Sequence, residues 1–262
     1  EQETERALQH LESVIQFEGP ATIAAICIES VVGTAGVMAP TPGYLEGLRK
    51  ICDKYGILWI ADEVMAGFGR TGEWFAFNNW NARPDLIVFA KGSNSGYVPA
   101  GGVIIDKPIY ETFVERVFPG GLTYSGHPLA MASIVATLDA MKEEKMVENA
   151  KNIGNKIIGP SLKELKEKHP SIGEVRGLGV FWAIEFVKNR NTKEALVAYN
   201  ASGKDAAPMN ELGAECKKLG LMPFINMNRL HVVPPCNVSE SDANKGLDIL
   251  DQAISVVDKY AN

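Results

Sequence analysis

Cysteines are few in this sequence, and long apolar runs are absent. The 262 residues include four cysteines, and no two of them have the C-x-x-C spacing of a zinc site or a redox dithiol. We therefore expect no metal site and four buried thiols, since a chain of this length does not need disulfide bonds to stabilise a core. No apolar run approaches the ~20 residues that cross a bilayer, and no charged start followed by an apolar stretch indicates a signal peptide. These absences predict a cytoplasmic protein with no membrane partner.

An excess of basic residues is also lacking. Lys and Arg number 26 against 32 Asp and Glu, which gives a formal net charge of −6 at pH 7. That balance argues against nucleic acid or an anionic membrane as a partner. The content of 46% hydrophobic and 22% charged residues is ordinary for a soluble globular protein. The expected partners are small molecules or other protein chains.

Short apolar runs alternate with amphipathic stretches in the first half of the chain. One such stretch, residues 44–56, has apolar side chains at helical spacing and ends at a glycine. The alternation is typical of an α/β fold, in which helices cover a parallel sheet and the strands are buried on both faces. The predicted strands span residues 23–28, 57–61, 86–90 and 102–105.

The pattern changes near residues 143–150, where we place a domain boundary. Residues 1–145 would form part of a large α/β domain, and residues 146–262 would form a smaller α+β domain. The predicted helices of the chain's second half span residues 127–145, 147–168, 205–219 and 239–260, and its predicted strands span residues 180–186 and 229–233.

Charged residues directly follow two of the predicted strands. Asp62 and Glu63 follow the strand ending at Ala61, and Lys91 follows the strand ending at Ala90. Ligands of parallel α/β sheets collect at the carboxyl ends of the strands. Burial of Lys91 there would favour its neutral amine, which can form a Schiff base with an aldehyde. The alternative, from this feature alone, is a lysine that extends into solvent.

A glycine-rich segment, residues 67–72, fits the G-x-G-x-x-G pattern of dinucleotide-binding turns. In such a turn the glycines directly follow a strand and directly precede a helix. Here five residues separate the predicted strand from Gly67, and residues 73–78 do not resemble the start of a helix. We therefore do not expect a dinucleotide site.

Three motifs occur together and in a recognisable order. They are residues 60–72, which include Asp62, residues 89–99, which include Lys91, and residues 121–130, which include Thr123. Together they resemble the class III pyridoxal-phosphate aminotransferases of fold type I, and the likeness covers nearly the whole chain. The resemblance implies a mostly parallel, seven-stranded-type large-domain sheet, part of it in this chain, with a smaller C-terminal α+β domain. It also implies that relatives have an N-terminal portion absent from this chain.

The resemblance implies roles for four residues around pyridoxal 5'-phosphate. Lys91 would hold the cofactor as a Schiff base and then move the proton of the donor carbon. Asp62 would pair with the pyridine nitrogen and keep it protonated. Val64 would pack against the ring face if the backbone stays extended after Asp62. Thr123 would donate its hydroxyl to the cofactor phosphate of the neighbouring subunit, which implies a homodimer or a dimer of dimers.

Many relatives bind an α-carboxylate through an arginine that alternates with a glutamate, and both positions differ here. Alignment on the Pro234-Pro235 pair puts His231 at the arginine position, and alignment on Gly33 and Gly36 puts Thr34 at the glutamate position. Arg229, two residues before His231, shares its strand face if the strand is regular and could bind a substrate anion instead. The flanking residues look closest to the branch that uses ω-amino compounds, including taurine aminotransferases.

Four further residues lie in family-like contexts without an expected catalytic role. We interpret Arg70, Arg176 and Glu29 as scaffold residues, since an arginine in a glycine-rich loop commonly ties the loop through its donors. His127, before Pro128, is expected to orient the start of a helix.

The predicted reaction is a ping-pong transamination from an ω-amino donor such as taurine or β-alanine to pyruvate or 2-oxoglutarate. Other donors of the class, 4-aminobutyrate, ornithine or a diamine, remain open. Alternatives are a racemase, aminomutase or decarboxylase on the same scaffold, or a non-catalytic protein that retains the fold.

Overall fold

The computed structural model describes residues 1–262, and the chain divides into two compact units. The first unit comprises residues 1–31, 40–68 and 73–145, and the second comprises residues 32–39, 69–72 and 146–262. None of the helices combines the length and the apolar character needed to span a bilayer.

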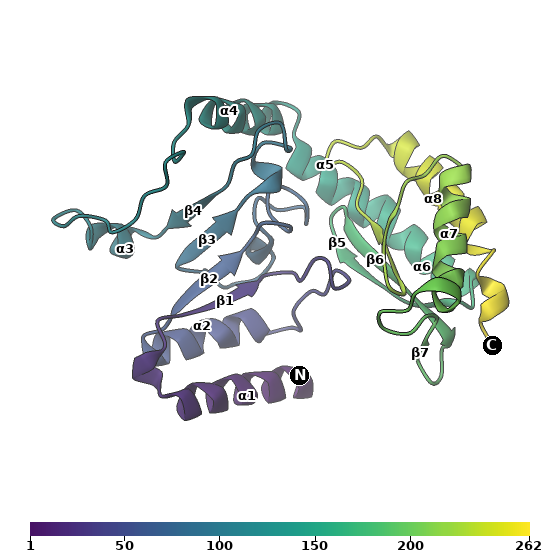
Figure 1. Cartoon of the computed structure of the whole chain (residues 1–262), viewed down its shortest axis with the longest axis horizontal. Helices are drawn as coiled ribbons and strands as arrows, with labels where there is room; N and C mark the ends of the chain where they lie inside the picture. The colour runs from purple at the N-terminus through teal and green to yellow at the C-terminus, as the bar shows by residue number, and fades with distance from the viewer. The chain divides into compact units, whose positions relative to one another are not determined.

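The first unit is built on a four-stranded sheet with the order β1-β2-β3-β4 (Figure 1). Strand β2 pairs in parallel with β1 and β3, whereas β4 is antiparallel to β3. All four predicted strands are present, which confirms the α/β fold, and the carboxyl ends of β1, β2 and β3 lie at one edge. The strands are β1 (Ala25–Glu29), β2 (Leu58–Asp62), β3 (Leu86–Phe89) and β4 (Gly102–Ile105).

Helices α1 (Gln2–Glu18) and α2 (Tyr44–Tyr55) form the core of this unit with β2. Trp59 and Ala61 of β2 are fully buried in that core, whereas Leu58, which points to the opposite face, is 37% exposed. Cys27 of β1 is exposed as well. The expectation that these strands are buried on both faces is therefore wrong for this chain, because the α1 and α2 core covers only the face that carries Trp59 and Ala61.

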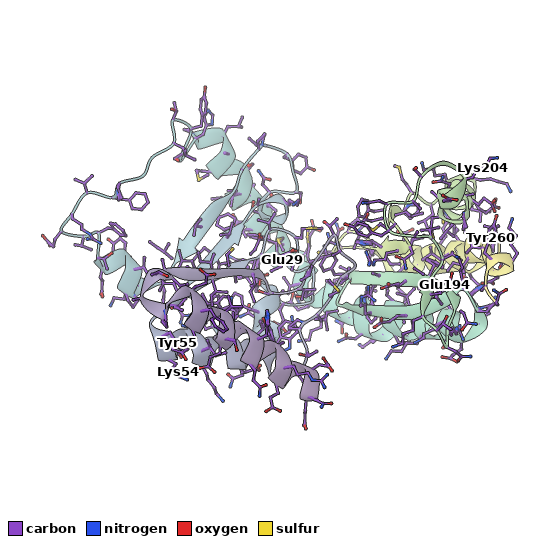
Figure 2. All side chains as sticks on the ribbon, turned by 60° about the horizontal axis from the view of Figure 1, so that its bottom comes forward. Glu29, Lys54, Tyr55, Glu194, Lys204 and Tyr260 are labelled. Atoms are coloured by element: carbon purple, nitrogen blue, oxygen red, sulfur yellow. The ribbon has the colours of Figure 1, made fainter.

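Surface contacts join α1 to α2 away from the sheet. Glu12 accepts from Lys54 Nζ at 2.5 Å and from Tyr55 Oη at 2.6 Å, and Figure 2 shows Lys54 and Tyr55 side by side on α2. The remaining elements of the unit are short, except for helix α4. At the start of α4, His127 Nδ1 accepts a hydrogen bond from Leu129 N at 3.2 Å, so His127 orients the beginning of this helix as predicted. The remaining elements are α3 (Lys107–Glu111), α4 (Pro128–Glu143), η1 (Pro20–Thr22), η2 (Ala76–Asn79) and η3 (Lys91–Ser93).

The second unit has a five-stranded sheet in which β5-β6-β9-β8 run antiparallel and β7 pairs with β6. Its helices pack against this sheet around a core that includes Ile184, Phe186 and Leu212. The strands are β5 (Ile172–Leu178), β6 (Phe181–Asn189), β7 (Glu194–Ala195), β8 (Phe224–Asn226) and β9 (Arg229–Val232). The helices are α5 (Met146–Ile153), η4 (Gly154–Ile158), α6 (Gly159–Lys168), η5 (Gly203–Ala206), α7 (Ala207–Lys218), α8 (Glu240–Ile254) and η6 (Asp258–Tyr260).

The single helix predicted over residues 147–168 is interrupted by the π-helical turn η4. Pro160, in the first turn of α6, has no N–H to continue a regular helical ladder. A Cβ at Gly154 would lie 1.9 Å from the carbonyl oxygen of Gly179, so only glycine fits at position 154 of this turn. The apolar spacing of the segment is helical throughout, which is why the interruption has no signature in the sequence.

Two of the four cysteines depart from the expectation of buried thiols. Cys52 and Cys216 are buried, and burial raises the pKa of each thiol to about 11. Cys236 is half-buried and Cys27 is exposed. The prediction fails at Cys27 because its side chain lies on the sheet face that α1 and α2 leave open.

Candidate functional site

The candidate site begins at the carboxyl ends of β2 and β3. Asp62 is the last residue of β2 and is paired in register with Val88 of β3. Lys91 follows three residues after Val88 and begins η3. The parallel pairing therefore brings both predicted residues to neighbouring strand ends within the first unit.

The Asp62 carboxylate is held by the backbone that follows it. Val64 N donates to Asp62 Oδ1 at 3.0 Å, and no protein donor lies within hydrogen-bonding distance of Oδ2. Val64 itself lies in a turn rather than in extended backbone, so the condition under which it would share a side with Asp62 is not met. Asp62 thus has one fixed oxygen and one that can accept from a ligand.

Lys91 occupies an unusual backbone position. Its φ is +42°, in the left-handed region that side-chain-bearing residues rarely adopt. Its side chain is exposed in this chain, so the burial expected at this strand end is not found, and the alternative of a lysine that extends into solvent describes this chain. Backbone strain of this kind is concentrated at functional sites, which agrees with a specific role for this lysine.

The segment around Lys91 is held by packing and hydrogen-bond contacts of residues to which the sequence analysis gave no role. A Cβ at Gly92 would lie 2.9 Å from Phe68 Cβ, so Phe68 packs directly on that glycine. On the other side of the lysine, the rings of Phe68 and Phe89 meet edge to face with centroids 5.7 Å apart. Asn94, which is buried, donates to Val98 O at 2.6 Å and ties the segment's own turn together. No local sequence pattern reveals these packing partners.

Thr123 lies in an exposed turn between α3 and α4 of the first unit. It has no hydrogen bond to Asp62 or Lys91 within the chain. The role implied for it, from a neighbouring subunit, remains a prediction.

A cluster of charged side chains lies on the sheet of the second unit. Arg176 Nη2 donates to Glu185 Oε2 at 2.6 Å, and Arg176 Nε donates to the carbonyl oxygen of Gly36 at 2.7 Å. Arg229 Nε lies 3.7 Å from the same Glu185 oxygen, and this buried nitrogen has no hydrogen-bond partner. Burial would raise the pKa of Glu185, but the hydrogen bond and charge of Arg176, with the charge of Arg229, outweigh it and lower the pKa.

The two positions that differ from many relatives lie in this same unit. In β9, Arg229 pairs with Glu185 and His231 pairs with Ala183, so Arg229 and His231 share one face of a regular strand, as predicted. The carbonyl oxygen of Thr34 accepts from Asn226 Nδ2 at 3.0 Å. Burial lowers the pKa of His231, and the charges of Arg229 and Arg176 lower it further. The lowered pKa favours a neutral imidazole at the position where many relatives have an arginine.

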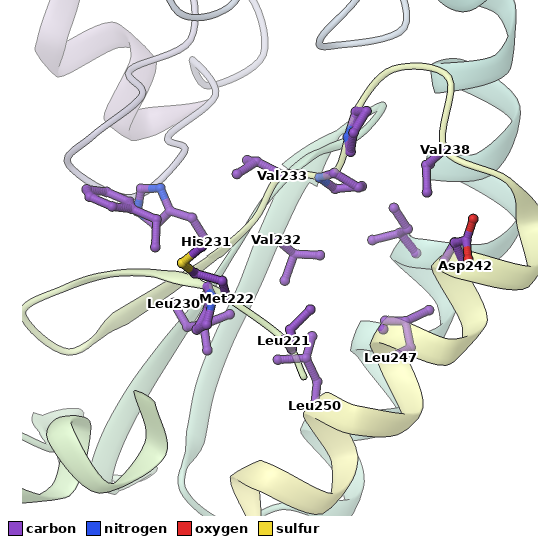
Figure 3. A pocket seen from close by; sticks show the side chains of 17 residues that line it. Leu221, Met222, Leu230, His231, Val232, Val233, Val238, Asp242, Leu247 and Leu250 are labelled. Atoms are coloured by element: carbon purple, nitrogen blue, oxygen red, sulfur yellow. The ribbon is translucent and has the colours of Figure 1, made fainter. Parts of the chain in front are cut away.

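His231 also lines a cavity of about 290 Å³ between the β8–β9 edge and α8 (Figure 3). The lining is almost wholly apolar, with Val232, Leu247 and Leu250 among the side chains around it. Asp242 is the one acidic side chain in the lining, and it accepts from Ser239 Oγ at the start of α8. The cavity therefore lacks a basic side chain that could hold an anionic substrate.

The scaffold interpretation of Arg70 is confirmed by its contacts. Arg70 Nη1 donates to the carbonyl oxygen of Pro234 at 2.5 Å, and Arg70 O accepts from Val180 N at 3.1 Å. Arg176 has a scaffold role too, through Gly36, but it also belongs to the charged cluster. Glu29, labelled in Figure 2, is the last residue of β1. It pairs in register with Asp62 of β2.

Residues 1–254 match the family model of the class-III aminotransferases. The chain belongs to this family. Its enzymes use pyridoxal 5'-phosphate, and the strand ends of the first unit fit that cofactor. They offer a carboxylate with an open oxygen for the ring nitrogen and a lysine for the aldehyde.

Named relatives extend along nearly the whole chain. The taurine–pyruvate aminotransferase of Bilophila wadsworthia is 33% identical over 257 residues, covering 96% of this chain and 56% of its own length. The putrescine–pyruvate aminotransferase of Pseudomonas aeruginosa is 42% identical over 189 residues, covering 72% of this chain and 41% of its own length. The chain thus spans about half the length of the relatives that it matches.

A solved structure shows the same fold. The taurine:2-oxoglutarate aminotransferase of Bifidobacterium kashiwanohense, in complex with PLP and glutamate, matches with a TM-score of 0.92 and 41% identity. The match covers 98% of this chain and 56% of that one. It confirms the expected fold type I architecture.

Proposed function

We propose that the protein containing this chain is a pyridoxal 5'-phosphate-dependent transaminase that transfers the amino group of an ω-amino donor to pyruvate or 2-oxoglutarate. The observation that supports this most directly is the placement of Asp62 and Lys91 at neighbouring parallel strand ends. The oxygen of Asp62 that is not held by Val64 and the left-handed backbone of Lys91 add to it.

Each residue of the site has one task in this proposal. Bound pyridoxal 5'-phosphate supplies an electron-accepting ring that stabilises negative charge at the donor carbon. Lys91 would hold the aldehyde carbon of the cofactor through its Nζ, and its amine would also take up and return the proton of the donor carbon. Asp62 would keep the ring nitrogen protonated, whereas Val64, which lies in a turn after Asp62, is not assigned to the ring face. Thr123 of a second subunit binds the phosphate, so the working enzyme is a homodimer or a dimer of dimers.

The charged cluster of the second unit supports an ω-amino donor. A neutral His231 and the uncharged Thr34 cannot form the arginine–glutamate pair that binds an α-carboxylate. Arg229 retains a buried, unpartnered Nε, and such a donor is costly unless an acceptor satisfies it. We assign Arg229 to the distal sulfonate or carboxylate of the donor, with His231 beside it. Taurine and β-alanine are donors of this kind.

Similarity to two taurine aminotransferases supports the donor, and they differ in the acceptor that their names give. The putrescine–pyruvate enzyme acts on a diamine, which has no distal anion. Donor specificity therefore has to be measured.

The reaction is tested first with Lys91→Ala in the full-length protein. This variant should lose the visible band of the attached cofactor and its turnover. Retention of both would refute the site. Mixing wild-type enzyme with donor alone should release one equivalent of carbonyl product and leave the aminated cofactor. Absence of any carbonyl product would favour a racemase, aminomutase or decarboxylase.

The substrate is tested with taurine, β-alanine, 4-aminobutyrate, ornithine and putrescine, each against both keto acids. We expect taurine or β-alanine to give the highest kcat/KM. Arg229→Gln should raise KM for these anionic donors and leave putrescine unaffected. Turnover of ornithine with none of taurine would overturn the assignment of the donor.

A further inference from the structure

Glu63 is a buried carboxyl that the proposed roles leave unused. Its side chain is fully buried, with 0% exposure. Ser30 Oγ, directly after β1, donates to Glu63 Oε1 at 2.5 Å. The first two amides of η2, Ala76 N and Phe77 N, donate to Oε2 at 2.7 Å and to Oε1 at 3.1 Å. One side chain therefore joins the end of β1 to the start of η2.

The backbone of Glu63 joins two more segments. Glu63 N donates to the carbonyl oxygen of Val88 in β3 at 2.9 Å, and Glu63 O accepts from Gly67 N at 3.0 Å. Asp62 precedes this residue, and Lys91 lies three residues after Val88. Glu63 is thus bonded to the strand that precedes Lys91 and to the turn that follows Asp62.

Burial acts against the charged form of the Glu63 carboxyl. Burial raises the pKa of Glu63; the bonds from Ser30 and from the two amides of η2 oppose this, and the charge of Asp62 adds to it. A buried ionisable group kept under these conditions next to a site residue indicates a functional contribution.

The geometry requires two acceptor oxygens. Ala76 N and Phe77 N point to different oxygens of Glu63. The amide of a glutamine has one acceptor oxygen, so in either orientation its NH₂ group would face one of these backbone donors. Glutamine would therefore keep the shape of the side chain and lose one of the two bonds to η2.

The turn that begins at Glu63 reaches the segment of Lys91 through Phe68. Phe68 N donates to Trp74 O at 2.6 Å, which closes the loop ahead of η2. The Phe68 side chain then packs on Gly92 and against the ring of Phe89, on both sides of the lysine. Movement of this loop would move the Lys91 segment.

We propose that Glu63 is a positioning residue that holds the Asp62 carboxylate and the Lys91 segment in a fixed arrangement for the cofactor. It acts through the turn that begins at Val64 and through η2, without touching the cofactor. This inference rests on the proposed function, in which Asp62 and Lys91 bind pyridoxal 5'-phosphate.

The test compares Glu63→Gln and Ser30→Ala with a matched control, Asp85→Asn, in the full-length protein. Asp85 Oδ2 also accepts from a backbone amide of β2, Trp59 N at 2.7 Å, and from Arg49 Nη1 at 2.7 Å. Those bonds lie at the opposite end of the strand from the site. Each protein is loaded with pyridoxal 5'-phosphate. The measurements are the unfolding midpoint, the dissociation constant of the cofactor, and the pH at which the visible band of the attached cofactor titrates.

Glu63→Gln should weaken cofactor binding roughly ten-fold, the factor that corresponds to one buried amide without an acceptor. The visible band should titrate at higher pH, because a misdirected Asp62 protonates the ring nitrogen less and the imine nitrogen becomes more basic. Ser30→Ala should change both quantities in the same direction but less, since the two amide bonds remain. Asp85→Asn should lower the unfolding midpoint and leave both cofactor measurements at wild-type values.

The inference is overturned if Glu63→Gln and Asp85→Asn change the cofactor measurements alike. It is also overturned if Ser30→Ala leaves both at wild-type values, and this comparison serves even if Glu63→Gln does not fold. A wild-type protein that does not attach the cofactor at Lys91 would instead refute the proposed function, and this inference with it.

Discussion

Glu185→Gln would remove the carboxylate that Arg176 and Arg229 share. The stronger contact is the 2.6 Å bond from Arg176 Nη2, between side chains that are 17% and 26% exposed. A hydrogen bond of this kind, to a charged group, contributes about 1.5–3 kcal/mol. The 3.7 Å approach of Arg229 Nε adds no more than about 1 kcal/mol. We expect a loss of about 2–3 kcal/mol of unfolding free energy at pH 7.

The pH dependence of this loss of unfolding free energy follows from the direction in which folding shifts the pKa of Glu185. The pKa of Glu185 is lower in the folded protein than its ordinary value of 4.5, so the unfolded chain binds more protons in that range. The contribution of Glu185 is therefore present above pH 4.5 and is lost as the pH falls through the lower folded value. Urea unfolding of wild type and Glu185→Gln at several pH values measures the difference in unfolding free energy between the two proteins. A difference that stays constant down to about pH 3, or is absent at pH 7, would refute the reasoning.

The same variant bears on the proposed substrate contact. Without its countercharge, Arg229 should bind an anion more tightly, so KM for taurine should fall while stability falls. A variant that lowers stability and also raises KM for taurine would argue against Arg229 as the anion-binding residue.

Two further predictions concern the second unit. Gly154→Ala should lower the unfolding free energy by about 2 kcal/mol or more, because its Cβ would lie 1.9 Å from Gly179 O. Gly246→Ala on α8, with no atom within 4 Å of the new Cβ, should instead raise it by about 0.5–1 kcal/mol, and urea unfolding compares the two. His231→Phe should reduce the loss of stability on acidification below pH 6.5, because the lowered pKa of His231 makes the unfolded chain bind more protons there. An unchanged slope of stability against pH would contradict that assignment.

The strands of the first unit could be predicted because a short apolar run between turn residues is typical of a strand in a covered sheet. The residues at their ends, Asp62 and Lys91, could be predicted because a parallel sheet brings strand ends to one edge. Burial of the sheet faces and burial of Lys91 could not be predicted from the sequence. The expected burial of both sheet faces depends on which elements cover them, and Leu58 shows that one face is open. Lys91 is also exposed in this chain, although burial was expected at this strand end.

Other features depend on contacts that are distant in sequence. The partners of Glu63 lie 33 residues before it and 13 and 14 residues after it, and two of them are backbone amides with no side-chain signature. Strand β8 is short and polar at one end, so it has no alternating pattern to detect. The expected position of Val64 requires extended backbone, which its bond to Asp62 replaces with a turn.

The left-handed backbone of Lys91 affects how this protein would respond to selection for stability in the laboratory. At φ +42° a glycine would avoid the steric cost that lysine bears, roughly 1–2 kcal/mol. A screen that selects variants for thermal stability alone would therefore favour loss of the lysine, and with it loss of the residue to which we assign the cofactor. Stability engineering of this protein needs position 91 held constant, or a selection for activity at each round.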